Sequence, residues 1–340
     1  MRHRIKSKLI NSYVGFVEKR NLNLLDYPMH FILLFFSYAY NLLVCARNFL
    51  FRFQILRSFS CEKPVVSIGN ISWGGTGKTT LSMFLASRLS FWYKVAILRR
   101  GWGADEEKLI KNRGLNVFSS SNRLRFARAQ ALNFDLFILD DGFQHRKLKR
   151  NVDIVVMNSR EFRQPFHLIP AGIFREKTNS LLRAQILVIT YKNEAENLKD
   201  AVSILISRFP HLQVFYATYK IKKFAAYDGK NFSLDDLKDR KIAACSGIGY
   251  PGGFYKLLQD SKINLSETIT FPDHQDVTLA ELKSLEKFLL AKGIKYLIIT
   301  EKDRYHLQVP REFNVTVIVA EIEIVIQDEP NFLETVKSFL

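Results

Sequence analysis

A glycine-rich segment between two apolar patterns contains the residues best suited to holding phosphate. Residues 65–68 are apolar and predict a buried strand, and apolar residues recur at helical spacing after Lys78. Backbone N–H groups at the start of such a helix can hold phosphate oxygens, Lys78 can reach the outer phosphates, and the Thr79 hydroxyl can bind Mg²⁺. The predicted nucleotide-binding residues are Ser72, Gly74, Gly75, Thr76, Gly77, Lys78, Thr79 and Thr80.

The general phosphate-loop pattern has glycine at position 72, where this chain has Ser72. The match is therefore to the inner segment Gly-Gly-Thr-Gly-Lys-Thr. A chance glycine-rich turn is the alternative, but the strand pattern before the segment and the helix pattern after it both favour a nucleotide site.

A second apolar run, residues 134–139, ends in Asp140 and Asp141. Carboxylates at the end of a strand beside a phosphate loop are suited to Mg²⁺ that bridges phosphates. We therefore predict Thr79, Asp140 and Asp141 as metal ligands. Both carboxylates are expected at the sheet edge, pointing to opposite faces if the strand continues.

Strand and helix patterns alternate along most of the chain, which predicts an α/β fold with a doubly wound, mostly parallel sheet of the phosphate-loop NTPase type. Four regions are expected. They are a basic and apolar segment at 1–60, a phosphate-loop core at 61–212, a two-strand linker at 213–230 and a smaller α/β lobe at 231–340.

Composition excludes a disordered chain, because 47% of the 340 residues are hydrophobic and 24% are charged. The formal net charge of +17 implies an acidic partner, which can be nucleic acid, an anionic membrane surface or a phosphorylated substrate. Three widely spaced cysteines form no pattern typical of a disulfide framework and favour a reducing compartment.

Residues 29–46 carry no formal charge and are strongly apolar, with basic residues before and after them. Their length is close to that of a membrane span, but several polar residues dilute the segment. A helix that lies in or dips into the bilayer surface is the favoured interpretation, and a buried core helix is the alternative. The late start of the apolar run argues against a secretory signal.

Taken in order, the motifs resemble the tetraacyldisaccharide 4′-kinase family of lipid A biosynthesis. They are Gly-Asn-Ile-Ser-Trp-Gly-Gly-Thr-Gly-Lys-Thr at 69–79, Arg-Gly-Trp-Gly at 100–103, Asp-Asp-Gly-Phe-Gln-His at 140–145, Pro-Ala-Gly-Ile-Phe-Arg-Glu at 170–176, Phe-Pro-Asp-His at 271–274 and Thr-Glu-Lys-Asp at 300–303.

The resemblance implies an enzyme that uses ATP and Mg²⁺ to phosphorylate the 4′-hydroxyl of a lipid-linked disaccharide 1-phosphate. It implies a site at an anionic membrane surface, on the cytoplasmic face of a Gram-negative inner membrane, with no nucleic-acid partner and a monomeric state. Asp105 and His274 match the family's proton-transfer pair and act with Lys78. The residues expected to bind substrate or support the site are Arg100, Gln144, His145, Arg175 and Glu176.

One segment departs from the family pattern. The stretch between Gly103 and Asp105 is much shorter than usual, and Ala104 and Glu107 stand where glycine and proline are typical. Glu106 is therefore the alternative to Asp105. A catalytically impaired family member and an ATPase switch that acts on protein or nucleic acid are the two competing hypotheses for the whole chain.

Overall fold

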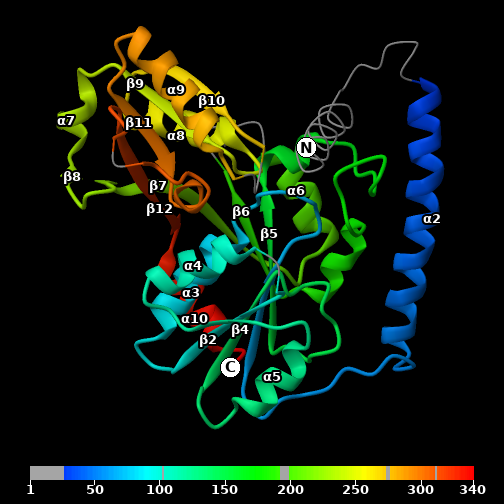
Figure 1. Cartoon of the computed structure of the whole chain (residues 1–340). Coiled ribbons are helices and arrows are strands. Elements are labelled where there is room, and N and C mark those ends of the chain that lie inside the picture. The colour runs from blue at the N-terminus through cyan, green and yellow to red at the C-terminus, as the bar shows by residue number, and fades with distance from the viewer. Residues whose placement is uncertain (1–26, 102, 192–198, 273–275, 311) are drawn as a thin grey trace. The chain divides into compact units, whose positions relative to one another are not determined.

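The computed structural model describes residues 27–340 apart from residues 102, 192–198, 273–275 and 311 (Figure 1). The chain forms two compact units. The phosphate-loop unit contains the described residues before 102 together with Ile110–Thr218 and Val325–Leu340, and the second unit contains Gly103–Leu109 and Tyr219–Ile324.

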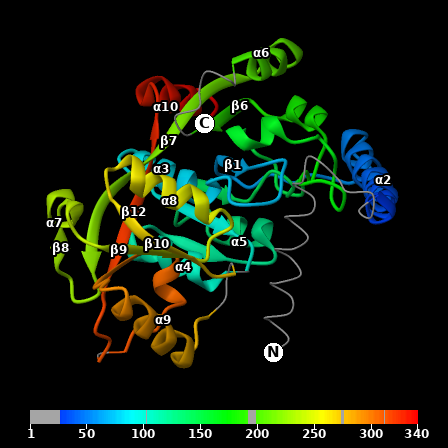
Figure 2. The same cartoon turned by 90° about the horizontal axis from the view of Figure 1, so that it is seen from above.

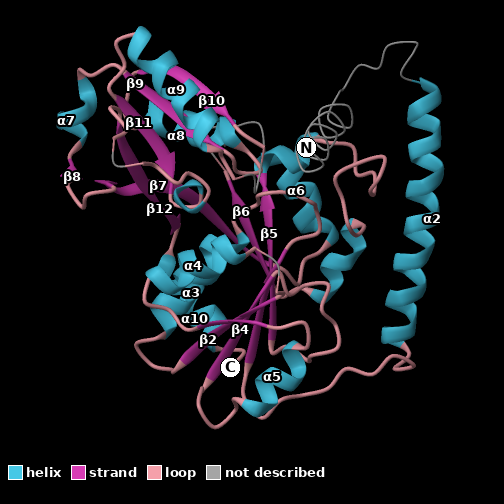
Figure 3. Cartoon of the chain, viewed as in Figure 1, coloured by secondary structure: helices cyan, strands magenta, loops and turns pink. Residues whose placement is uncertain are grey.

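The centre of the phosphate-loop unit is a parallel sheet of seven of the described strands (Figure 3). The five central strands are buried on both faces, which explains why they are nearly continuous apolar runs in the sequence, whereas the two outermost strands are partly exposed. Val66 lies beside Ile138 on one side and Val152 on the other. In order across the sheet, the strands are β3 (Val117–Ser119), β2 (Val95–Arg99), β4 (Leu136–Asp140), β1 (Val65–Gly69), β5 (Val152–Asn158), β6 (Ile186–Thr190) and β7 (Gln213–Ala226).

Helices cover both faces of this sheet. On one face, Ala127 of α5 (Arg123–Ala129) packs near Phe137, and Val202 of α6 (Lys199–Arg208) packs in a cluster with Val155. On the other face, Phe332 of α10 (Glu329–Lys337) contacts the ring of Phe84 in α3 (Lys78–Leu89). The predicted doubly wound phosphate-loop fold is confirmed.

The second unit has its own parallel strands, in the order β10 (Leu265–Thr270), β9 (Ile242–Ser246), β11 (Tyr296–Thr300) and β12 (Thr316–Ile326). The short strand β8 (Asn231–Phe232) pairs antiparallel with the end of β7. Its helices are α7 (Leu234–Lys238), α8 (Pro251–Asp260), α9 (Leu279–Ala291) and the start of α4 (Ala104–Asn112). The side chain of Thr278 caps α9 by accepting from the backbone of Glu281, and Glu281 returns the bond.

Two differences from the predicted regions are clear. The sequence assigned 231–340 to one lobe, whereas Val325–Leu340 groups with the phosphate-loop unit. The linker was predicted at 213–230 alone, whereas both β7 and β12 continue from one unit into the other. A strand that crosses a unit boundary has the same apolar pattern as any other strand, so the pattern alone does not reveal it.

Helix α2 (Tyr27–Arg52) is long and strongly apolar. Most of its large side chains are exposed, including Phe35 at 70% and Leu43 at 70%, and only Ser37 and Val44 are buried. No other described helix covers its outer side (Figure 2). The alternative of a buried core helix is therefore wrong, and by length and composition α2 could cross a membrane.

Candidate active site

The phosphate loop connects β1 to α3, as the sequence predicted. Gly77 precedes the first turn of α3 with φ of 88°, a left-handed conformation that favours glycine. No side chain of the described residues caps the helix at Gly77. The first-turn N–H groups and the positive end of the helix dipole therefore remain suited to phosphate, and Lys78 and Thr79 are the first residues of the helix.

Polar contacts beneath the loop hold its shape. Asn70 Nδ2 donates to Thr76 Oγ1 at 3.1 Å, and Ser72 Oγ donates to Glu161 Oε1. Glu161 lies in the 3₁₀ helix Ser159–Arg163 and is 4% exposed. Burial raises the pKa of Glu161 to about 7, although the Ser72 hydrogen bond and the charge of Lys78 oppose the rise. The charge of Glu161 therefore changes near neutral pH, directly beneath the loop.

Replacing Glu161 by glutamine is expected to flatten the pH dependence of stability. The folded protein binds the Glu161 proton more tightly than the unfolded chain does, whose glutamate pKa is near 4.5. The stabilisation is therefore fully present below pH 4.5 and is lost as the pH rises to about 7, a change of about 3 kcal/mol. Urea unfolding of both proteins between pH 4.5 and 8 measures the difference. An identical pH dependence in the two proteins would contradict this assignment.

Asp140 is the last residue of β4 and is 3% exposed. Its two carboxylate oxygens accept from α3, Oδ2 from Thr79 Oγ1 and Oδ1 from Ser82 Oγ, both at 3.1 Å. Arg99 Nε lies 3.7 Å from Oδ2. The Thr79 hydroxyl and the Asp140 carboxylate are thus adjacent at the start of α3. A hydroxyl and a carboxylate in this position are the protein ligands that a phosphate-loop NTPase offers to Mg²⁺.

Asp141 follows the end of β4 with φ of 50°, so its side chain leaves the strand pattern. Arg175 Nη1 donates to its Oδ1 at 3.1 Å, and Lys78 Nζ lies 3.7 Å from the same oxygen. Burial acts to raise the pKa of Asp141, but the charges of Lys78 and Arg175 outweigh it and the pKa is lowered. Asp141 therefore sets the position of the loop lysine.

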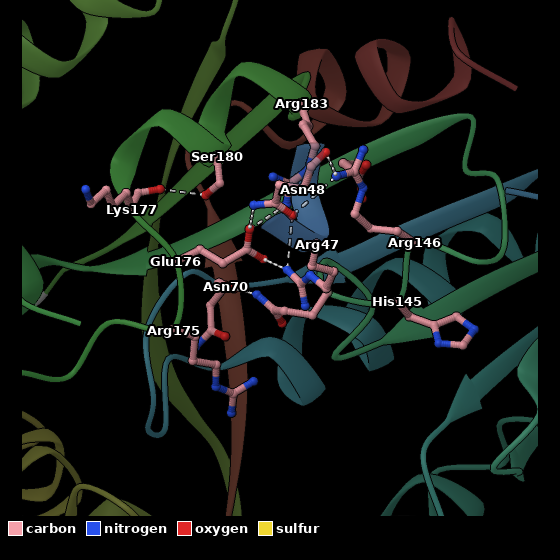
Figure 4. A network of polar contacts seen from close by, with 12 residues as sticks. Arg47, Asn48, Asn70, His145, Arg146, Arg175, Glu176, Lys177, Ser180 and Arg183 are labelled. Atoms are coloured by element: carbon pink, nitrogen blue, oxygen red, sulfur yellow. Dashed lines mark hydrogen bonds and ion pairs between the residues drawn. The ribbon is translucent and has the colours of Figure 1, made fainter. Parts of the chain in front are cut away.

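The residues of this unit that were predicted to bind substrate or support the site each have a different environment. Gln144 Nε2 donates to Asn70 O at 2.8 Å and so supports the loop. Burial and the charge of Arg123 lower the pKa of His145 to about 4, so this imidazole is neutral at pH 7. Arg100 is exposed after the end of β2. Glu176 is 1% exposed and points away from Arg175 toward α2 (Figure 4).

Asp105 belongs to the second unit, where it is 6% exposed in the first turn of α4. His306 Nε2 lies 3.3 Å from Asp105 Oδ2, and Lys302 Nζ lies 3.9 Å from the same oxygen. On its other side, His306 Nδ1 lies 2.9 Å from Asp276 Oδ1. The pKa of His306 is raised, chiefly by the Asp105 hydrogen bond, against the effect of burial. His274, the predicted partner of Asp105, lies outside the described residues.

Three of these neighbours were not predicted. Glu161 and His306 carry no local pattern that separates them from surface residues, and Lys302 lies in the Thr-Glu-Lys-Asp motif at 300–303, to which no role was assigned. Among the described residues, no group of three or more His, Cys, Asp and Glu side chains is arranged to hold a metal ion. A Mg²⁺ bound through one carboxylate, one hydroxyl and nucleotide phosphates does not need such a group.

Comparison with known proteins decides the family. The model of the family described as "Tetraacyldisaccharide-1-P 4'-kinase" matches residues 29–340. The chain belongs to this tetraacyldisaccharide-1-P 4′-kinase family. Curated relatives named tetraacyldisaccharide 4′-kinase include that of Halothermothrix orenii, which is 29% identical over 100% of this chain and 99% of its own length. The Aquifex aeolicus relative is 32% identical over 81% of this chain and 89% of its own length.

A solved structure of this kinase family agrees with the fold. The structure of LpxK from Aquifex aeolicus in complex with ATP, described as its "apo" form, matches with a TM-score of 0.71 and 28% sequence identity. The match covers 92% of this chain and 99% of the other. Kinase activity and ATP as the nucleotide are therefore properties that this chain shares with its family.

Proposed function

We propose that this protein transfers the γ-phosphate of ATP to the 4′-hydroxyl of a tetraacylated disaccharide 1-phosphate, as a step of lipid A biosynthesis. The observation that supports it most is the phosphate loop itself, in which Lys78 is held by Asp141 and Thr79 is bound to Asp140. The family match over residues 29–340 names the acceptor class.

Different residues of the chain bind the phosphates, stabilise their charge and would hold the metal ion. Backbone N–H groups of residues 74–78 hold the phosphate oxygens at the positive end of α3, and Lys78 stabilises the charge that develops on the transferred phosphoryl group. Arg175 orients the Asp141 carboxylate through an ion pair, and Asp141 in turn orients the Lys78 ammonium group. Thr79 and Asp140 are the residues that would hold Mg²⁺, which when bound neutralises phosphate charge.

Asp105 is the proposed general base. The Asp105 carboxylate lies beside an imidazole, with 3.3 Å between its Oδ2 and His306 Nε2. When His306 is neutral and carries its proton on Nδ1, which faces Asp276, the Nε2 lone pair can receive the proton that Asp105 takes from the sugar hydroxyl. His274 stays a predicted member of this group.

Acceptor-dependent release of ADP tests the proposed function. Purified protein in neutral detergent micelles is mixed with ATP, Mg²⁺ and the tetraacylated disaccharide 1-phosphate. ADP release that rises with acceptor concentration supports a kinase. ATP hydrolysis that is indifferent to the lipid and sensitive to nucleic acid would instead support the ATPase switch.

We also propose that α2 holds the protein at an anionic membrane surface on the cytoplasmic side. The apolar side chains of α2 that are exposed on the protein become buried in the membrane, and the net charge of +17 attracts the protein to anionic lipid. Replacing Phe35 or Leu43 by glutamate is expected to weaken binding to vesicles of anionic phospholipid roughly tenfold for each change. Both side chains are exposed, so the melting temperature is expected to stay constant, and unchanged vesicle flotation would contradict the role of α2.

A further inference from the structure

Three arginines gather around Glu176 beside the C-terminal half of α2 (Figure 4). Arg47 Nη2 lies 3.3 Å from Glu176 Oε1, and Arg183 Nη2 donates to Oε2 at 3.0 Å. The third, Arg146, donates to the carbonyl and the side chain of Asn48, both at 3.3 Å. Arg47, Arg146 and Arg183 are called the arginine cluster below.

The arginine cluster has more positive charge than its surroundings neutralise. Arg47 and Arg183 share the single carboxylate of Glu176, and Arg146 contacts the neutral Asn48, whereas Arg150 has Asp153 to itself at 2.7 Å. Burial and the neighbouring charge of Arg183 lower the pKa of Arg146 to about 10, against the effect of Glu176. An additional anion would therefore reduce the repulsion within the cluster.

Two hydrogen-bond donors of the arginine cluster also lack a partner among the described residues. They are the Nε atoms of Arg47 and Arg183, and both are buried. Buried donors of this kind are rare and suggest a ligand or water. The Arg47 side chain is 33% exposed and that of Arg183 is 19% exposed, so other atoms of both side chains are open to solvent, and the two Nε atoms require a small shift of the side chains to meet a ligand. Phosphate, with several acceptor oxygens, matches guanidinium groups well.

The surroundings suit a phosphate that carries acyl chains. Leu43, one turn before Arg47 on α2, is 70% exposed, and the Phe51 ring lies 4.7 Å from the Arg146 guanidinium carbon. The cluster also borders the nucleotide loop, because the backbone N–H of Glu176 donates to Ile71 O at 3.2 Å. An apolar helix face, a cationic cluster and a phosphate loop thus lie next to one another in one unit.

We infer that the arginine cluster binds the 1-phosphate of the lipid acceptor while the 4′-hydroxyl is presented to the phosphate loop. The inference rests on the proposed function, and it assigns a second phosphate site beside the nucleotide site. The phosphate of an anionic phospholipid headgroup shares this chemistry, so the experiment separates the two sources.

Acceptors with and without the 1-phosphate provide the test. Arg146→Ala and Arg183→Ala are expected to raise KM for the 1-phosphate acceptor about tenfold or more, and to leave KM for the acceptor that lacks it unchanged. Arg146→Lys, which keeps the charge, is expected to lie between Arg146→Ala and wild type. Arg88→Ala is the matched control, because Arg88 is a half-exposed arginine on α3 paired with Glu329.

Two results would overturn the inference. An equal rise in KM for both acceptors means that the cluster only fastens α2 to the core. Weaker binding to anionic phospholipid vesicles, with KM for the 1-phosphate acceptor unchanged in neutral micelles, assigns the cluster to the bilayer instead. A wild-type protein that phosphorylates neither acceptor refutes the proposed function, which is a different outcome from either of these.

Discussion

Lys78→Ala is expected to reduce phosphoryl transfer from ATP to the lipid acceptor by about a thousandfold or more. Lys78 is the first residue of α3, and the lysine at this position of a phosphate loop reaches the outer phosphates of the nucleotide. Alanine removes the only mobile positive charge of the loop segment 74–80, and the N–H groups that remain cannot follow the moving phosphoryl group. Single-turnover transfer with saturating ATP measures the loss.

Arg88→Ala, at the opposite end of the same helix, is the control for general damage to α3 and is expected to keep wild-type rates. The fold should survive Lys78→Ala, because Asp141 keeps its contact with Arg175 at 3.1 Å. A Lys78→Ala protein that is well folded and still transfers phosphate within tenfold of wild type would show that the phosphate loop is not the site of transfer.

Asp105→Asn is expected to lower kcat about a hundredfold to ten-thousandfold, with KM for ATP little changed. Asparagine keeps the shape of the side chain and its contact with His306, but it cannot accept a proton from the sugar hydroxyl. Glu106→Gln is the matched variant, because Glu106 is the neighbouring carboxylate and also lies 3.9 Å from Lys302. We expect Glu106→Gln to keep most of its activity, and the reverse result would move the base to Glu106.

The pH profile adds a second readout for Asp105. Because the pKa of His306 is raised, its imidazole stays protonated to higher pH than an ordinary histidine. If His306 receives the proton from Asp105, the rate rises as this imidazole becomes neutral, at a pH above 6.5. His306→Gln is expected to remove that rise. A rise that persists in His306→Gln would assign the titration to another group, with His274 the first to examine.

Features that depend on neighbouring residues in the chain could be predicted from the sequence. The β1 run, the glycine-rich turn and the start of α3 are contiguous in the chain, so the strand and helix patterns predict that the turn lies between β1 and α3. The β4 run and its two aspartates are also contiguous, so the strand pattern predicts carboxylates at the end of β4. Parallel pairing of β1 with β4 then brings Thr79 to Asp140.

Contacts between distant residues that lie outside the strand and helix patterns of the phosphate loop could not be predicted. Asp105 and His306 are 201 positions apart, and Asn48 and Glu176 are 128 positions apart. A lone charged residue gives no signal in the sequence that separates a solvated surface residue from a buried partner. The same limit applies to Glu161, whose raised pKa comes from burial, a property of the folded chain.

Asp140 and Asp141 also show which features the sequence predicts and which appear only in the folded chain. The sequence placed both at the sheet edge and expected opposite faces if the strand continued. The strand ends at Asp140, and the left-handed φ of 50° at Asp141 turns the second carboxylate toward Lys78 and Arg175. Thr79 and Asp140 are therefore the adjacent pair proposed to hold Mg²⁺, and Asp141, which contacts Lys78 and Arg175, stays a predicted ligand.

The most direct test of the account is the position of the phosphate in the product. The protein is incubated in detergent micelles with ATP labelled at the γ-phosphate and a tetraacylated disaccharide 1-phosphate, and the lipid product is purified and its phosphate positions are mapped. We expect one labelled phosphate at the 4′ position, absent with Lys78→Ala and strongly reduced with Asp105→Asn. Consumption of ATP that leaves the lipid unlabelled, or label at any other position, would contradict it.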